Sequence, residues 1–99
     1  MNLDKKIEKL GYTKTSDNEY GIYYEKYVET YKYTHIVAIL NKASGRHILQ
    51  SYDKDCICKD VCGNAGVGLT YEEMRIFTKK MKQSVRKWKR QERRVDGSD

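Results

Sequence analysis

The last third of the chain has the residues of one long helix. The chain contains no proline, and glycine is absent between residues 71 and 93, so nothing there breaks a helix. Thr70 and Glu73 have the spacing of a capping box, in which each side chain accepts a hydrogen bond from the other residue's backbone N–H. Glu72 and Glu73 also place negative charge at the positive end of the helix dipole. The pattern therefore predicts a helix from Tyr71 to about Arg93.

One face of this predicted helix is apolar. At 100° per residue, six of its side chains fall within an arc of about 100°, and these are Met74, Phe77, Thr78, Met81, Val85 and Trp88. We expect this face to dock on the rest of the protein, because burying one such side chain contributes roughly 1.5–3 kcal/mol. Since the apolar face ends at Trp88, the helix from Lys89 onward is expected to project beyond the body or to fray.

The opposite face of the predicted helix is cationic. Residues 79–94 hold nine Lys or Arg and one Glu, whereas the rest of the chain holds 11 basic and 13 acidic residues. Five of the cations recur at alternating spacings of three and four residues and share one side of the helix. We term them the cationic stripe, which consists of Lys79, Lys82, Arg86, Lys89 and Arg93.

Three explanations fit the cationic stripe. It is an ordinary solvated surface with favourable charge toward the helix C-terminus, a contact with nucleic-acid phosphates, or a helix lying on a membrane surface. The membrane explanation conflicts with the use of the apolar face in the core, so no membrane partner is expected. Nine cations beside a single acid are also more than a solvated surface usually carries without pairing. The leading hypothesis is a non-catalytic module that binds nucleic acid, or another acidic partner, through the stripe.

The first two thirds of the chain have alternating and turn-forming patterns. We expect a helix over residues 4–10, strands over 20–29, 33–41 and 46–52, turns over 15–18 and 41–45, and a polar loop over 53–68. Consecutive strands with short connections favour an antiparallel meander. The predicted fold class is α+β: a helix, a three-stranded antiparallel meander and a long C-terminal helix packed on one sheet face. We expect one domain over residues 1–94 and a disordered tail over 95–99.

Nine of the 99 residues are tyrosines. In the strand predicted over 20–29, alternation places Tyr24 on one face and Tyr23 and Tyr27 on the other. If the helices cover one face, the aromatic side chains of the other stay open, where they can stack bases or form an interface. Tyrosines are also simply good strand formers. The alternative function is therefore a protein-interaction or homo-oligomerisation domain, such as a homodimer, with Tyr23 and Tyr27 in its interface.

The three cysteines form a cluster at Cys56, Cys58 and Cys62. Together with His35 or His47 they have the donors of a tetrahedral zinc site. The spacing differs from the common C-x₂-C knuckle and a second pair is missing, so we expect no metal and no cofactor.

No segment has the pattern of a catalytic site. The glycines of residues 63–68 lack both the spacing and the lysine of a phosphate-binding loop, and we expect the protein not to be an enzyme. The odd number of cysteines, the polar N-terminus and the absence of an apolar run of about 18 residues predict a cytoplasmic protein with reduced thiols.

Three phrases carry a resemblance to known proteins, namely Asp17–Gly21, His47–Tyr52 and Gly68–Met74. They are similar to phrases in small uncharacterised proteins of Gram-positive (Firmicutes) prophages and mobile elements, and they span most of the chain. This resemblance implies a genetic setting and no mechanism. The predicted order of helix, three strands and helix also resembles the topology of double-stranded RNA-binding domains.

Overall fold

The computed structural model describes residues 2–42, 44–58 and 63–97, with the backbone alone at 57–58, 63–64 and 88–97. Two helices and five strands make up these residues. They are α1 (Leu3–Lys9), β1 (Thr13–Asn18), β2 (Gly21–Val28), β3 (Tyr33–Asn41), β4 (His47–Cys58), β5 (Gly63–Gly66) and α2 (Tyr71–Gly97). Among these described residues, no helix is both long and apolar enough to cross a membrane.

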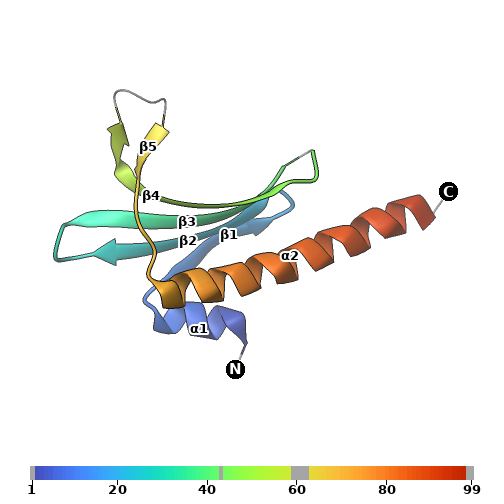
Figure 1. Cartoon of the computed structure of the whole chain (residues 1–99), viewed down its shortest axis with the longest axis horizontal. Coiled ribbons are helices and arrows are strands. Elements are labelled where there is room, and N and C mark those ends of the chain that lie inside the picture. The colour runs from blue at the N-terminus through green and yellow to red at the C-terminus, as the bar shows by residue number, and fades with distance from the viewer. Residues whose placement is uncertain (1, 43, 59–62, 98–99) are drawn as a thin grey trace.

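The strands form one antiparallel sheet in the order β1-β2-β3-β4-β5. Figure 1 shows both helices on the same side of this sheet, so the protein has two layers and leaves one sheet face open. The predicted α+β class, both helices, and the strands corresponding to β2 and β3 are confirmed. The predicted number of three strands is wrong, because the sheet gains a strand at each edge.

The first added strand is β1, which contains the residues 15–18 that we expected to form a turn. Its side chains are almost all exposed, and β1 is an edge strand that pairs only with β2. The turn lies after β1 instead, between Asn18 and Gly21, which pair across it. Gly21 has a φ of +154°, and a Cβ there would clash with the carbonyl oxygen of Ile39. Polar edge residues and turn residues look alike in sequence, which explains the error.

The second added strand comes from residues 53–68, which we expected to form a loop. Instead β4 continues to Cys58 and pairs with β5. The register shifts between Tyr52 and Ile57, so the pairing is irregular. An edge hairpin with polar residues has no apolar alternation, and the sequence therefore lacks the usual signal of a strand.

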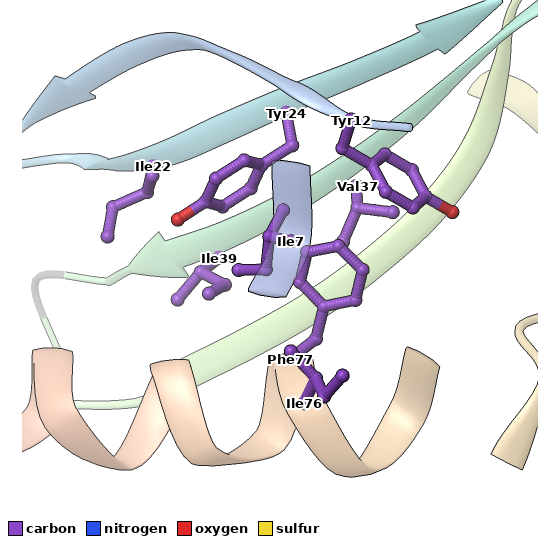
Figure 2. Close-up of a cluster of buried hydrophobic side chains, with 8 residues drawn as sticks. All are labelled: Ile7, Tyr12, Ile22, Tyr24, Val37, Ile39, Ile76 and Phe77. Atoms are coloured by element: carbon purple, nitrogen blue, oxygen red, sulfur yellow. The ribbon is translucent and has the colours of Figure 1, made fainter. Parts of the chain in front are cut away.

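The core lies between the sheet and the two helices. Its buried residues are Ile7, Tyr12, Ile22, Tyr24, Val37, Ile39, Ile76 and Phe77. Figure 2 shows Phe77 pointing from α2 toward the sheet and the aromatic rings. Its ring meets that of Tyr12 edge to face at 5.1 Å and that of Tyr24 at 5.5 Å between centroids. These contacts join α2 to the start of β1 and to β2 (Figure 2).

The face of α2 that docks differs from the predicted one. Phe77 is buried as expected, but Ile76 is only 5% exposed while Met74 is 46% exposed. The buried side of α2 also includes Lys80, whose ammonium pairs with Asp4 at 3.1 Å. Helix α2 packs against α1 as well as against the sheet. It is therefore rotated about its axis toward α1, and part of its apolar face stays exposed.

The far end of α2 extends past the sheet, as Figure 1 shows. This agrees with the projection predicted from Lys89 onward. The helical backbone continues to Gly97, into the segment that we expected to be a disordered tail. Residues 98–99 lie outside the described residues.

Candidate functional site

Five polar side chains meet between the N-terminal end of α2 and the sheet. The hydroxyl of Tyr12 contacts both the Oε2 of Glu73, in a short hydrogen bond, and the Nδ1 of His35 at 3.2 Å. The other ring nitrogen of His35, Nε2, lies 2.5 Å from the Oγ of Ser51. The ammonium of Lys26 lies 3.7 Å from Glu73 Oε2 and 4.7 Å from the centre of the Tyr12 ring. We term this group the buried polar network.

Hydrogen-bonding capacity assigns the protons of this network. An ionised carboxylate only accepts, so the Tyr12 hydroxyl donates to Glu73. The Tyr12 oxygen then accepts from Nδ1–H of His35, which leaves Nε2 of the neutral ring to accept from the Ser51 hydroxyl. Each donor therefore meets an acceptor, as a buried polar group requires.

Burial and the neighbouring groups keep these charge states. Burial lowers the pKa of His35, which favours its neutral form. Burial and the adjacent Glu73 raise the pKa of Tyr12. Burial alone would raise the pKa of Glu73, but hydrogen bonds from Tyr12 and Thr70 and the charge of Lys26 outweigh it, so that pKa is lowered.

The buried polar network fixes the start of α2 to the sheet. The predicted capping box is confirmed: Thr70 N–H donates to Glu73 Oε1 at 2.9 Å, and Glu73 N–H donates to Thr70 Oγ1 at 3.1 Å. Glu73 thus caps α2 with one oxygen and binds Tyr12 with the other. Because His35 is only 3% exposed, its ring is inaccessible to a ligand, and we assign the network a structural role.

Sequence reasoning missed most of this network. It considered His35 as a zinc donor and gave no role to Tyr12 or Ser51. The register pairs Ser51 with Val37, a core residue, and so places Ser51 on the covered face. A usable signal was present, because an alternating strand that buries Val37 also buries His35.

The cationic stripe lies on the exposed side of α2. The side chains of Lys79, Lys82 and Arg86 are exposed, and none forms an ion pair with another described residue. At 100° per residue, the axis of the stripe lies about 160° around the helix from buried Phe77. Lys89 and Arg93 fall on the helical backbone of α2, and their side chains lie outside the described residues.

The open face of the sheet carries the other predicted site residues. Tyr24 is 1% exposed on the helix side, whereas Tyr27 is 58% exposed and Tyr23 half-buried on the other. Tyr52 shares that face, since it pairs with Ile36, the partner of Glu25. The predicted alternation along β2 agrees with the burial pattern.

The cysteine cluster falls mostly outside the described residues. Cys56 is exposed, Cys58 is described by its backbone alone, and Cys62 is outside the described part. The two histidines have other partners, since His35 belongs to the buried polar network and His47 Nδ1 lies 2.9 Å from Asn41 Oδ1. Among the described side chains, no three His, Cys, Asp or Glu groups gather closely enough to hold a metal ion.

Comparisons of this chain with protein-family models, with curated proteins and with solved structures gave no match. Only the geometry and charge of the described surfaces therefore indicate a function.

Proposed function

We propose that this protein binds nucleic acid through the cationic stripe of α2. The observation that carries the proposal is the position of Lys79, Lys82 and Arg86, which are exposed on the side of α2 away from its buried face. The two further members of the stripe, Lys89 and Arg93, extend the same line along the helical backbone. The stripe thus belongs to a helix whose first turns are held in place by the core and the buried polar network.

Charge supports phosphate as the ligand. The remainder of the chain is close to neutral, so the positive field concentrates on one end of one helix. Arginine and lysine bind phosphate strongly, and each phosphate contact releases condensed counterions. If three to five cations contact phosphates, the logarithm of the affinity falls with the logarithm of salt concentration with a slope of about −3 to −4.5.

The test is a fluorescence-anisotropy titration of the whole chain with labelled nucleic acid at several salt concentrations. Arg86→Ala is expected to weaken binding and to reduce the salt slope by about one unit. Arg46→Ala is the matched control, because Arg46 is exposed in the β3–β4 turn and outside the stripe. Absence of binding to duplex or single strand at low salt would refute the proposal.

A second candidate function uses the open sheet face. Tyr27 is 58% exposed on a face that no described helix covers, and tyrosine is enriched at protein interfaces. This observation supports a homo-oligomer or a complex with another protein. Light scattering tests the homo-oligomer: Tyr27→Ser should weaken it, whereas Tyr31→Ser, in the β2–β3 turn and 77% exposed, should not. A monomer at high concentration would remove this form of the candidate.

A further inference from the structure

A polar groove lies beside the cationic stripe. It has a volume of about 370 Å³ and separates the β1–β2 turn and the end of β3 from the middle of α2. Its size falls in the range of small-ligand sites, which is about 300–1,000 Å³. Asn18 and Glu19 line it from the turn, Gln83, Ser84 and Lys87 line it from α2, and Ile22 contributes an apolar surface.

The groove and the stripe are continuous along α2. Gln83 follows Lys79 by four residues and precedes Arg86 by three, and such spacings make helix residues surface neighbours. Lys87 lies one turn beyond Gln83 on the same wall. A polymer whose phosphates follow the stripe therefore passes the mouth of the groove.

The groups in the groove suit a ligand that both donates and accepts hydrogen bonds. Gln83 accepts a hydrogen bond from Lys80 through Oε1 at 3.2 Å, and its amide nitrogen has no partner among the described residues. The carboxylate of Glu19 likewise has no described partner and can accept from an N–H group. The acids Asp17 and Glu19 are balanced in the lining by Lys80 and Lys87, so the groove has no net charge and suits an uncharged hydrogen-bonding group.

The turn that carries these acceptors is firmly built. Asn18 Oδ1 accepts from the backbone N–H of Tyr20 at 2.8 Å, and Asn41 Nδ2 donates to the carbonyl of Glu19 at 3.2 Å. The groove therefore has an apolar surface and hydrogen-bonding groups on two walls.

We propose that this groove takes one unpaired nucleobase of a nucleic acid bound along the stripe, an inference that rests on the proposed function. A base has apolar faces and an edge of donors and acceptors, which match Ile22, Glu19 and Gln83. A base paired within a duplex cannot enter the groove, because its edge and faces are already engaged. The expected ligand is thus a single strand or a loop whose bases carry N–H donors.

The experiment compares two labelled probes with equal numbers of phosphates, a fully paired duplex and a hairpin with an unpaired loop. The wild-type chain should bind the hairpin about five- to tenfold more tightly, because the base adds its own hydrogen bonds to the phosphate contacts. Gln83→Ala and Glu19→Gln should remove this preference and leave duplex affinity and the salt slope unchanged. Arg86→Ala should weaken both probes and retain the preference.

Two controls separate the possible failures. Gln50→Ala and Glu29→Gln change exposed residues that do not line the groove, and they should keep the preference. Circular dichroism shows whether each variant is folded. Equal binding of the two probes, or a preference unaffected by Gln83→Ala and Glu19→Gln, would overturn the groove proposal and leave the stripe in place. If neither probe binds at low salt, both proposals fail.

Discussion

At the scale of single residues, Tyr12 connects more parts of the protein than any of its neighbours in the buried polar network. Its hydroxyl bonds to Glu73 of α2 and His35 of β3, its ring packs on Phe77, and Lys26 of β2 lies over its face. It is 1% exposed, so water cannot replace these partners. Tyr12 thereby links Glu73, the carboxylate that caps α2, to the sheet.

Removing only the hydroxyl of Tyr12 should be costly. Tyr12→Phe keeps the ring packing and leaves Glu73 and His35 without their shared partner, which should lower the free energy of unfolding by about 1–3 kcal/mol. Urea denaturation followed by circular dichroism measures the change. Tyr31→Phe, at a position 77% exposed, should change stability by no more than about 0.5 kcal/mol. A similar result for the two variants would mean that the Tyr12 hydroxyl contributes nothing to stability.

At the scale of elements, the orientation of α2 determines which of its residues meet a partner. The helix packs on both the sheet and α1, and its salt bridge from Lys80 to Asp4 belongs to the second contact. This orientation exposes Met74 and Tyr71 next to the stripe. It also places Gln83 and Lys87 at the groove.

Two substitutions in α2 test that orientation. Ile76→Ala should destabilise the protein by about 2–5 kcal/mol, because it opens a cavity at a buried site. Met74→Ala should cost less than about 1 kcal/mol, because much of the side chain is already in water. Denaturant unfolding measures both changes, provided that the dependence of the unfolding free energy on denaturant concentration has the same slope in the two variants. If Met74→Ala were the more damaging change, the apolar face predicted from periodicity alone would be the one that docks.

At the scale of the whole molecule, the protein is a thin two-layered body with an extended arm. Its dimensions are 53 × 37 × 21 Å, and α2 runs past the sheet in Figure 1. Charge follows the same division, since the cations concentrate toward the C-terminal part of α2. Stability as a function of pH also depends on the whole molecule, because ionisable groups of several elements share the buried region.

Stability should be greatest between about pH 7 and pH 10 and should fall on both sides. The pKa of His35 is lowered from 6.5 by burial, so the unfolded chain takes up its proton first and stability falls as pH drops below about 6.5. The lowered pKa of Glu73 means a further loss below its ordinary value of 4.5. Above about pH 10, the raised pKa values of Tyr12 and Tyr24 make the unfolded chain ionise first, which again favours unfolding.

Thermal melts across pH 3–11 measure this profile. His35→Gln should flatten the fall in stability between pH 7 and pH 5, since it removes the titrating ring. His47→Gln, at the other histidine, should leave that fall in place. A wild-type profile without any fall between pH 7 and pH 5 would contradict the neutral, buried state assigned to His35.

The sequence by itself determined the features that depend on residues close together in the chain. The capping box of Thr70 and Glu73, the helical backbone that follows it, and the opposite placement of Tyr24 and Tyr27 along β2 all come from local spacing. Helix periodicity and strand alternation have a geometry that a few neighbouring residues specify. The same periodicity put the cationic stripe on one line.

Only the tertiary structure determined which faces meet. The rotation of α2 toward α1, the strand β1, and the meeting of Tyr12 with His35 and Glu73 all depend on residues far apart in the chain. The polar residues of an edge strand form backbone hydrogen bonds because a neighbouring strand lies beside them. The buried tyrosine reaches its carboxylate partner only when two elements pack together. Such contacts leave no periodic signal in a single sequence, because they depend on how elements pack against each other and not on the order of residues within one element.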